Sequence, residues 1–285
     1  MTRAIQRQKA LRLVQTTVLL GGMVFLAARA AALVVGPFFG WMLVLVVPFI
    51  TLYSLSGQQL LLPSGTRRLH PAEAPEVYRI LQLLVRRAGL DFVPPVYLLP
   101  SGNAEALTTG VGSGVRILLS RGLLSGLTLR ELRAVLAHEV SHIRNRDLPL
   151  FALAGAMQRI TRMTGLILAA LVFLLFPLLL AGVPVIPVQA LLYITAVPLV
   201  TVLVQFALLR TREFQADLGA AELTGDPEAL VSALTKLETV RRPFWNLLVL
   251  TGGRRSGLGE LLRTHPGTEE RIRRLRELRA ELLYD

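Results

Sequence analysis

Two long apolar tracts with almost no charged residues set the limits on how this chain of 285 residues can fold. Residues 13–66 contain a single charged side chain, Arg29, and residues 163–209 contain none. A membrane-spanning helix needs about 20 predominantly apolar residues, so each tract is long enough for two spans. Outside the tracts, charged residues are as frequent as in ordinary soluble domains, where they make up about 25% of the chain. The pattern excludes a simple soluble enzyme and predicts soluble segments interrupted by membrane helices.

Glycine and proline divide each tract into a helical hairpin. Gly36-Pro37 separates the first pair of spans, and a turn containing Gly182 separates the second pair. The four predicted spans are Leu13–Val35, Phe38–Ser56, Met163–Ala181 and Val188–Leu209. Two buried hairpins of a soluble protein are the alternative, but 47 consecutive uncharged residues favour the membrane.

The distribution of basic residues predicts the orientation in the membrane. Arginine and lysine precede the first span and are frequent in 67–162 and 210–285, whereas both hairpin turns are nearly free of them. Because cytoplasmic flanks collect Lys and Arg, we expect both termini and both charged segments on the cytoplasmic side of the inner (plasma) membrane. Ala28-Arg29-Ala30 also resembles a signal-peptidase site, but cleavage there would still leave 67–162 inside.

Composition narrows the possible chemistry further. The chain has no cysteine, which excludes disulfides, thiolate nucleophiles and cysteine-ligated metals. It has only four histidines, so imidazole chemistry must use His70, His138, His142 or His265. The net charge of +12 is explained by the membrane flanks, and no basic patch interleaved with aromatic residues is present. We therefore expect no nucleic-acid partner.

A metal-binding pattern lies on a predicted helix that opens with a capping box, Thr128-Leu-Arg-Glu131. This helix follows a helical stretch, 73–88, and short strand-like runs at 96–99, 104–109 and 115–120. His138 and His142 are one helical turn apart, so both imidazoles can occupy corners of a tetrahedral zinc site. Glu139 lies beside them, where it can accept a proton from water that zinc acidifies. Two surface histidines on a helix are the alternative.

A zinc hydrolase of this kind needs a third protein ligand, and no other histidine lies nearby in the sequence. The segment Arg212-Glu213-Phe-Gln-Ala-Asp217 directly follows the second apolar tract. Glu213 can supply the ligating carboxylate, and Asp217, one turn later, can hydrogen-bond a ligating imidazole. A solvated acidic pair is the alternative. We predict one zinc ion per chain, held by His138, His142 and Glu213.

In this order the motifs resemble the M48 metallopeptidases, and among them the HtpX-like membrane heat-shock proteases of bacteria. The motif His-Glu-x-x-His is shared by many zinc peptidases, but five matching segments in one order are specific. They are His138–His142 followed by Arg146-Asp147; Glu213–Asp217; Asn103-Ala104 followed by Thr109-Gly110; Gly122-Leu123-Leu124; and Thr264-His265-Pro266 followed by Glu270-Arg271-Ile272.

The resemblance implies a membrane-embedded zinc endopeptidase that degrades damaged or misfolded membrane proteins on the cytoplasmic side. It implies that Glu139 is the general base and that Asp147, like Asp217, supports a ligating histidine. Asn103 and Ala104 would begin an edge strand that holds the substrate by strand addition. His265 and Arg271 would lie near the site and stabilise the oxyanion.

We therefore expect an α+β, zincin-like catalytic domain combined with four transmembrane helices. The domains would be an N-terminal hairpin (1–62), the first catalytic part (63–162), a second hairpin (163–209) and the second catalytic part (210–285). The expected partners are the lipid bilayer and polypeptide substrates, and the sequence leaves the oligomeric state open. Three alternatives remain: a processing protease of narrow specificity, an inactive zinc-binding scaffold, and an accessory subunit of a transporter or channel.

Overall fold

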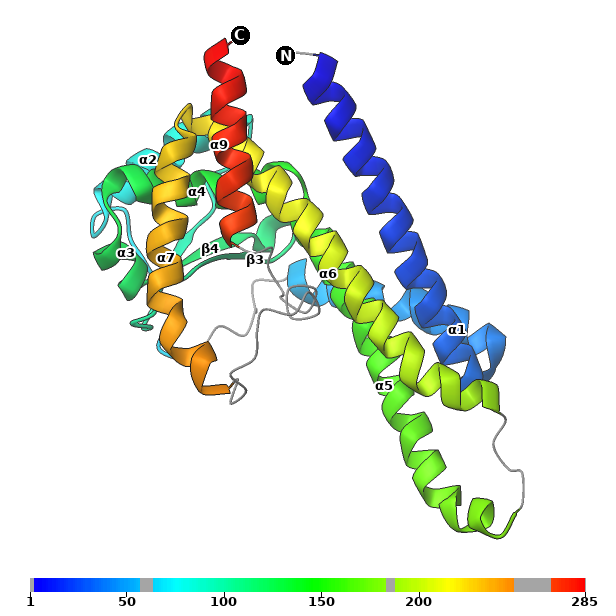
Figure 1. The fold of residues 1–285 in the computed structure, drawn as a ribbon. Coiled ribbons are helices and arrows are strands. Elements are labelled where there is room, and N and C mark those ends of the chain that lie inside the picture. Colours follow the sequence, from blue (N-terminus) through cyan, green and yellow to red (C-terminus); the bar gives the residue numbers. More distant parts are fainter. Residues whose placement is uncertain (1–2, 57–63, 183–187, 249–267, 285) are drawn as a thin grey trace. The chain divides into compact units, whose positions relative to one another are not determined.

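The structure is a computed structural model that describes residues 3–56, 64–182, 188–248 and 268–284 (Figure 1). Its contacts divide the chain into two compact units. Unit 1 comprises Met1–Tyr53 and Leu150–Thr211, and unit 2 comprises Ser54–Pro149 and Arg212–Asp285. Each unit is therefore built from two stretches that are far apart in the sequence.

Unit 1 consists of long apolar helices. Helix α1 (Arg3–Ser56) is interrupted at Gly36, whose backbone has φ 81° and ψ 162°, so it consists of two helical segments. The turn predicted at Gly36-Pro37 is thereby confirmed. The apolar parts of α5 (Asp147–Leu180) and α6 (Val188–Thr224) complete the unit.

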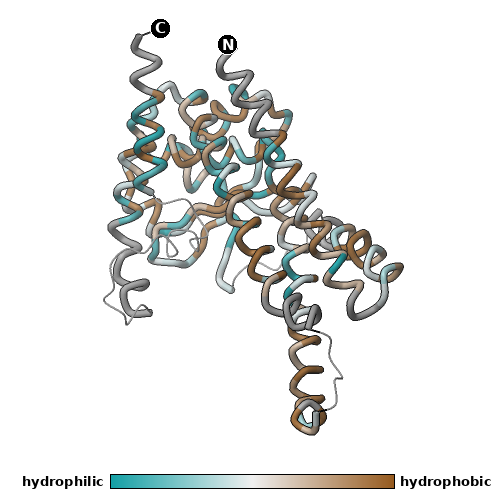
Figure 2. The backbone as a smooth tube through the Cα atoms, turned by 45° about the vertical axis from the view of Figure 1, so that its right-hand side comes forward, coloured by the Kyte–Doolittle hydropathy of each residue, from teal (hydrophilic) through white to brown (hydrophobic). Residues whose placement is uncertain are grey.

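Two helices among the described residues are long and apolar enough to cross a membrane, Val14–Ala32 and Asp147–Leu178. The apolar stretch Gly36–Ile50 is shorter. Figure 2 shows the contrast between the largely hydrophobic long helices and the more hydrophilic helix at the C-terminus. The structure therefore suggests a membrane unit with two candidate spans, while the total of four stays a prediction.

The surface of α5 suits hydrocarbon better than water. Only 17% of its apolar window is buried inside the chain, and Phe173 and Leu174 are 83% and 72% exposed. The hydroxyls of Thr161, Thr164 and Thr201 each donate to the carbonyl four residues earlier in their own helix. In hydrocarbon polar groups must be satisfied within the protein, and these bonds meet that requirement for the three hydroxyls. Thr16 Oγ1 and Gln205 Oε1, also in unit 1, are buried without a hydrogen-bond partner among the described residues.

Unit 2 contains a four-stranded sheet in the order β1-β2-β4-β3. β2 and β4 are parallel, while β1 pairs antiparallel with β2, and β3 pairs antiparallel with β4. The strands are β1 (Arg67–Arg68), β2 (Val96–Leu99), β3 (Ala106–Thr109) and β4 (Arg116–Ser120). The prediction for β2 is confirmed to the residue, and β3 forms an edge of the sheet.

Helices pack around this sheet and enclose the core of the unit. Besides the C-terminal part of α6, they are α2 (Pro75–Ala88), the 3-10 turn η1 (Gly112–Gly114), α3 (Arg121–Gly126), α4 (Leu129–Arg144), α7 (Pro227–Leu248) and α9 (Thr268–Tyr284). Side chains of α2, β4 and α4 make up much of the core, and Leu81, Ile117 and Leu136 are fully buried.

Helix α4 begins at the predicted capping box and is fastened there to α7. The Glu131 carboxylate accepts a hydrogen bond from the backbone N–H of Thr128, and the backbone N–H of Glu131 donates to the Thr128 hydroxyl. Ser232 and Lys236 of α7 donate to the same carboxylate at 2.6 and 2.8 Å. Burial alone would raise the pKa of Glu131, but these donors lower it to about 2. The start of α4 is thereby fixed, and with it the position of His138 and His142 along the helix axis.

The edge strand is shorter than predicted. β3 begins at Ala106, so Asn103 and Ala104 lie in the segment before it. The Ser120 hydroxyl donates to the Asn103 carbonyl at 2.6 Å and accepts from the Glu105 N–H at 2.9 Å. A side chain thus takes up two backbone groups there, although the Glu105 carbonyl already accepts from the Ser120 N–H at 2.9 Å.

Candidate metal centre and active site

Three potential metal ligands converge in unit 2. His138 and His142 lie on α4, and Glu213 lies on the part of α6 that belongs to the same unit. The Nε2 atoms of the two histidines are 3.2 Å apart. Glu213 directs Oε2 to within 3.6 Å of His138 Nε2 and Oε1 to within 3.8 Å of His142 Nε2. All three side chains are buried.

These distances fit one tetrahedral metal ion. Zinc binds histidine nitrogen at about 2.0–2.1 Å, which places the nitrogen atoms of neighbouring tetrahedral ligands about 3.3 Å apart. The observed separations of 3.2–3.8 Å between the donor atoms are close to that value. Two imidazoles and a carboxylate are also the donors of many catalytic zinc sites, in which a fourth position stays open.

His138 is held in the orientation that a metal ligand needs. Its Nδ1 atom lies 3.0 Å from Asp217 Oδ1, which leaves Nε2 for the metal. Arg271 of α9 donates to both oxygens of Asp217, at 2.8 and 2.6 Å. The Nη1 atom of the same arginine lies 3.3 Å from Glu213 Oε2. Arg271 therefore connects a supporting carboxylate with the third potential ligand.

His142 is supported in the same way by a second carboxylate and a second arginine. Its Nδ1 atom lies 2.7 Å from Asp147 Oδ2, and Arg212 Nε donates to Asp147 Oδ1 at 2.5 Å. Asp147 is fully buried. It reaches the histidine because Arg146, with φ 56°, turns the chain sharply between α4 and α5. Each histidine is thus backed by an aspartate, and each aspartate by an arginine.

A glycine allows the two ligand-bearing helices to approach each other closely. A Cβ atom on Gly219 of α6 would lie 2.5 Å from the Oγ atom of Ser141 on α4. Ser141 is fully buried, so its hydroxyl has little room to move. Gly219 therefore sets the spacing that brings Glu213 and Asp217 to the histidines.

Burial and charge together shape the protonation of the site. Burial alone lowers the pKa of His138, but the carboxylates of Asp217 and Glu213 raise it to about 10. Burial also opposes ionisation of Asp217 and Arg271, yet their mutual attraction lowers the pKa of the aspartate and raises that of the arginine. The carboxylates that favour a proton on the His138 imidazole also favour a metal cation bound there in place of the proton.

Glu139 lies beside the potential ligands and is buried. Its Oε2 atom accepts a hydrogen bond of 2.5 Å from the hydroxyl of Thr108 on β3. The carboxylate is therefore held in place from the edge strand.

The structure brings most of the predicted site residues together. His138 and His142 gather with Glu213, and the remaining members of the cluster are Asp147, Asp217 and Arg271. Glu139 is buried next to His138 on α4 and accepts a hydrogen bond from Thr108. Asn103 and Ala104 precede the edge strand, and His265 lies outside the described residues. Thr108 and Arg212 were not predicted as site residues. A threonine in a strand carries no distinguishing pattern, and Arg212 offered only its position next to Glu213.

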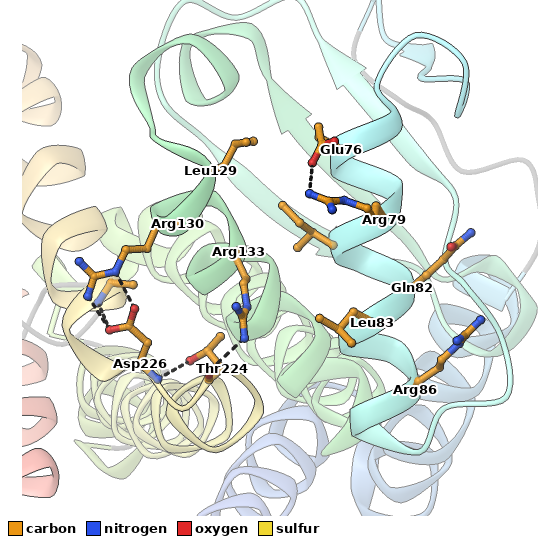
Figure 3. Close-up of a pocket in the computed structure, with 12 residues that line it drawn as sticks. Glu76, Arg79, Gln82, Leu83, Arg86, Leu129, Arg130, Arg133, Thr224 and Asp226 are labelled. Atoms are coloured by element: carbon orange, nitrogen blue, oxygen red, sulfur yellow. Dashed lines mark hydrogen bonds and ion pairs between the residues drawn. The ribbon is translucent and has the colours of Figure 1, made fainter.

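A separate groove of about 570 Å³ lies in unit 2 between α2 and the start of α4 (Figure 3). Its arginines are largely engaged within the unit. Arg130 makes two hydrogen bonds to Asp226, and Arg133 donates to the Thr224 carbonyl at 3.1 Å. Just outside the groove, Arg87 of α2 donates to the Leu223 carbonyl at 2.7 Å. Arg87 and Arg133 therefore satisfy carbonyls at the C-terminus of α6, which has no further turn to bond them.

Comparison with known proteins agrees with this geometry. The family model described as peptidase family M48 matches residues 71–279. The chain is 37% identical over 227 residues to a protease HtpX homolog of Acaryochloris marina, covering 75% of each chain. It is 33% identical over 240 residues to a protease HtpX homolog of Ralstonia pickettii, covering 79% of this chain and 82% of the relative. The chain therefore belongs to peptidase family M48 and is an HtpX-like metalloprotease.

Proposed function

We propose that this metalloprotease is a zinc endopeptidase, anchored in the inner membrane, that cleaves damaged or misfolded membrane proteins on the cytoplasmic side. The observation that carries the proposal is the convergence of His138, His142 and Glu213 with a buried Glu139 beside them. A zinc-binding scaffold would need the three ligands but would have no use for Glu139. The substrate class and the location are supported by the resemblance to HtpX-like proteases.

In the proposed mechanism His138, His142 and Glu213 hold one zinc ion. A zinc ion held there would supply Lewis-acid polarisation of the substrate carbonyl and would lower the pKa of bound water. Glu139 accepts the proton of the attacking water and returns it to the amine nitrogen of the departing product. Asp217 and Asp147 keep the two imidazoles in the ligating orientation.

Arg271 has two proposed roles. It was predicted to stabilise the oxyanion, together with His265. Its contacts support an additional role, because its guanidinium holds Asp217 and also faces Glu213. A buried arginine in that position balances two buried carboxylates, each of which would be costly alone.

An extended polypeptide is the substrate that the sheet favours. β3 is an edge strand and pairs with β4 on one side. An edge strand offers free backbone N–H and C=O groups, to which a peptide can add as a further strand. We propose that Asn103 and Ala104, at the entrance to β3, contact that peptide.

The proposed domain arrangement has two membrane hairpins, 1–62 and 163–209, and a catalytic domain made of 63–162 and 210–285. The division of contacts into units 1 and 2 supports it. The exposed apolar side chains of α5 support a membrane location. The arginine-rich flanks support a cytoplasmic position for both termini and for the catalytic domain.

The test uses the purified full-length chain in detergent. We expect one zinc ion per chain by elemental analysis and cleavage of unfolded casein. Glu139→Gln should keep the zinc and lose activity by about 10²–10⁴, the usual contribution of a general base. Glu76→Gln, at a half-exposed glutamate paired with Arg79, is the matched control and should change neither zinc nor cleavage.

Four outcomes would contradict parts of the proposal. Unchanged turnover by Glu139→Gln would remove Glu139 from the mechanism. Stoichiometric zinc without cleavage of any unfolded protein would favour a scaffold, and cleavage at a single bond of one substrate would favour a processing protease. Reporter fusions after Arg68 and after Asp285 should both report the cytoplasm, and an external reading for either would refute the topology.

A further inference from the structure

The edge strand contacts the catalytic helix through one buried hydrogen bond. Successive side chains of a strand point to opposite faces. Ala106 and Thr108 therefore share a face, on which Ala106 packs against the core and Thr108 is 8% exposed. Leu107, on the other face, is 51% exposed. The Thr108 hydroxyl lies 2.5 Å from Glu139 Oε2.

Among the described residues, Thr108 is the only hydrogen-bond partner of the Glu139 carboxylate. The neighbouring carboxylates are more heavily engaged. Asp147 and Asp217 each bond a histidine and an arginine. The orientation of Glu139 therefore depends on a single hydroxyl that comes from another part of the chain.

We propose that Thr108 is a positioning residue for the general base, an inference that rests on the proposed function of Glu139. The hydroxyl donates to Oε2, so Oε1 remains available to accept the proton of the attacking water. A glutamate side chain has several torsions, and its terminal torsion is broad, so the carboxylate without this bond would rotate among many orientations. Proton transfer requires a base within hydrogen-bond reach in a defined geometry.

The hydrogen bond between Thr108 and Glu139 also connects the general base with β3, the edge strand of the sheet. Thr108 is paired in register with Ile117 of β4, so its hydroxyl is aimed by the sheet. A peptide that adds to the edge of the sheet would bind to the same strand that orients the base. Thr108 therefore links the proposed peptide-binding strand to the proton acceptor.

The test compares Thr108→Val, which keeps the shape and removes the hydroxyl, with Thr108→Ser, which keeps the hydroxyl. We expect Thr108→Val to lower kcat roughly 10- to 100-fold, the effect of losing a hydrogen bond to a charged group. KM for casein should stay within about twofold and zinc content should not change, because no ligand is touched. Thr108→Ser should restore kcat to within about threefold of the wild type.

Thr235→Val in α7 is the matched control. It removes a hydroxyl that donates only to the Val231 carbonyl of its own helix. The same substitution chemistry should leave kcat, KM and zinc content unchanged. A loss of kcat in Thr108→Val alone therefore reports the site and not a general effect of replacing threonine.

A double variant tests whether Thr108 acts through Glu139. In a Glu139→Gln background, Thr108→Val should cause no further loss of the residual rate, because the group that it positions is already disabled. Wild-type kcat in Thr108→Val, or an equal loss in both backgrounds, would overturn the inference while zinc-dependent cleavage by the wild type still stood. If the zinc-loaded Glu139→Gln variant cleaves as fast as the zinc-loaded wild type, the proposed function is overturned instead, and this inference with it.

Discussion

Replacing Asp147 with asparagine separates the two tasks of that side chain. Asp147 is fully buried and uses both carboxylate oxygens, Oδ2 for His142 and Oδ1 for Arg212. Asparagine has nearly the same shape but only one oxygen, and its NH₂ group is a donor. One of the two donors, on His142 or on Arg212, must therefore face another donor.

The expected effects have different sizes and appear in different measurements. Loss of a carboxylate behind a ligating histidine typically weakens metal binding by 10- to 100-fold, or about 1.4–2.7 kcal/mol. Arg212 would be left with a buried charge that lacks its counter-ion, which costs about 3–5 kcal/mol of the free energy of unfolding. Domains have a total stability of about 5–15 kcal/mol, so one in the upper part of that range can lose this much and still be folded.

The assay measures both quantities on the same protein. Zinc affinity comes from competition with a chelator of known affinity, and the free energy of unfolding comes from urea titration in detergent. The double variant Asp147→Asn with Arg212→Met removes the stranded charge. It should regain most of the stability but keep the weakened zinc binding, since His142 still lacks its carboxylate.

Asp226→Asn is the matched control. Asp226 bonds Arg130 on a partly exposed surface and also accepts from the Ala229 N–H at the start of α7. Exposed ion pairs contribute about 0–1 kcal/mol, and asparagine caps a helix as well as aspartate does. Zinc affinity should not change. The reasoning is refuted if Asp147→Asn binds zinc as tightly as the wild type, or if the double variant regains zinc affinity together with stability.

Three further predictions concern the surroundings of the site. The pKa of Glu131 is lowered from 4.5 to about 2, so its stabilising effect is complete above pH 4.5 and is lost as the pH falls towards 2. Glu131→Gln should lower the free energy of urea unfolding by about 1–2 kcal/mol at pH 7 and by less at pH 4. This magnitude allows for the solvent screening of the half-exposed Lys236. Gly219→Ala should cost about 1–3 kcal/mol and weaken zinc binding, because its Cβ would collide with Ser141; unchanged zinc affinity would show that the spacing of the helices is not critical. Arg271→Lys should lower zinc affinity about 10-fold or more, since lysine cannot form the two parallel hydrogen bonds, and a chelator titration equal to that of the wild type would contradict this.

The features that the sequence predicted well depend on local geometry. His138 and His142 share a helical face wherever their segment is helical, and the capping box at Thr128 defines where that helix begins. The turn at Gly36 likewise follows from a residue that tolerates positive φ and a proline that ends the preceding helix. In each of these cases residues within one or two turns determine the outcome.

The features that the sequence did not reveal depend on contacts between distant segments. Thr108 meets Glu139 across 31 residues, and Arg212 meets Asp147 across 65. Nothing in the local pattern of either segment indicates such a partner. The start of β3 was placed too early for a similar reason, because the Ser120 side chain of β4 bonds the Asn103 carbonyl and the Glu105 N–H just before Ala106.

The order in which the cluster residues occur along the chain determines when the cluster can be completed during synthesis. Thr108, His138 and His142 are synthesised first, and 70 residues separate His142 from Glu213. At about 5–20 residues per second, translation of that interval takes several seconds, and Arg271 follows later still. During this time the nascent chain carries two imidazoles and a base but lacks the proposed third ligand. The cluster is therefore complete only after α9, which carries Arg271, has been synthesised.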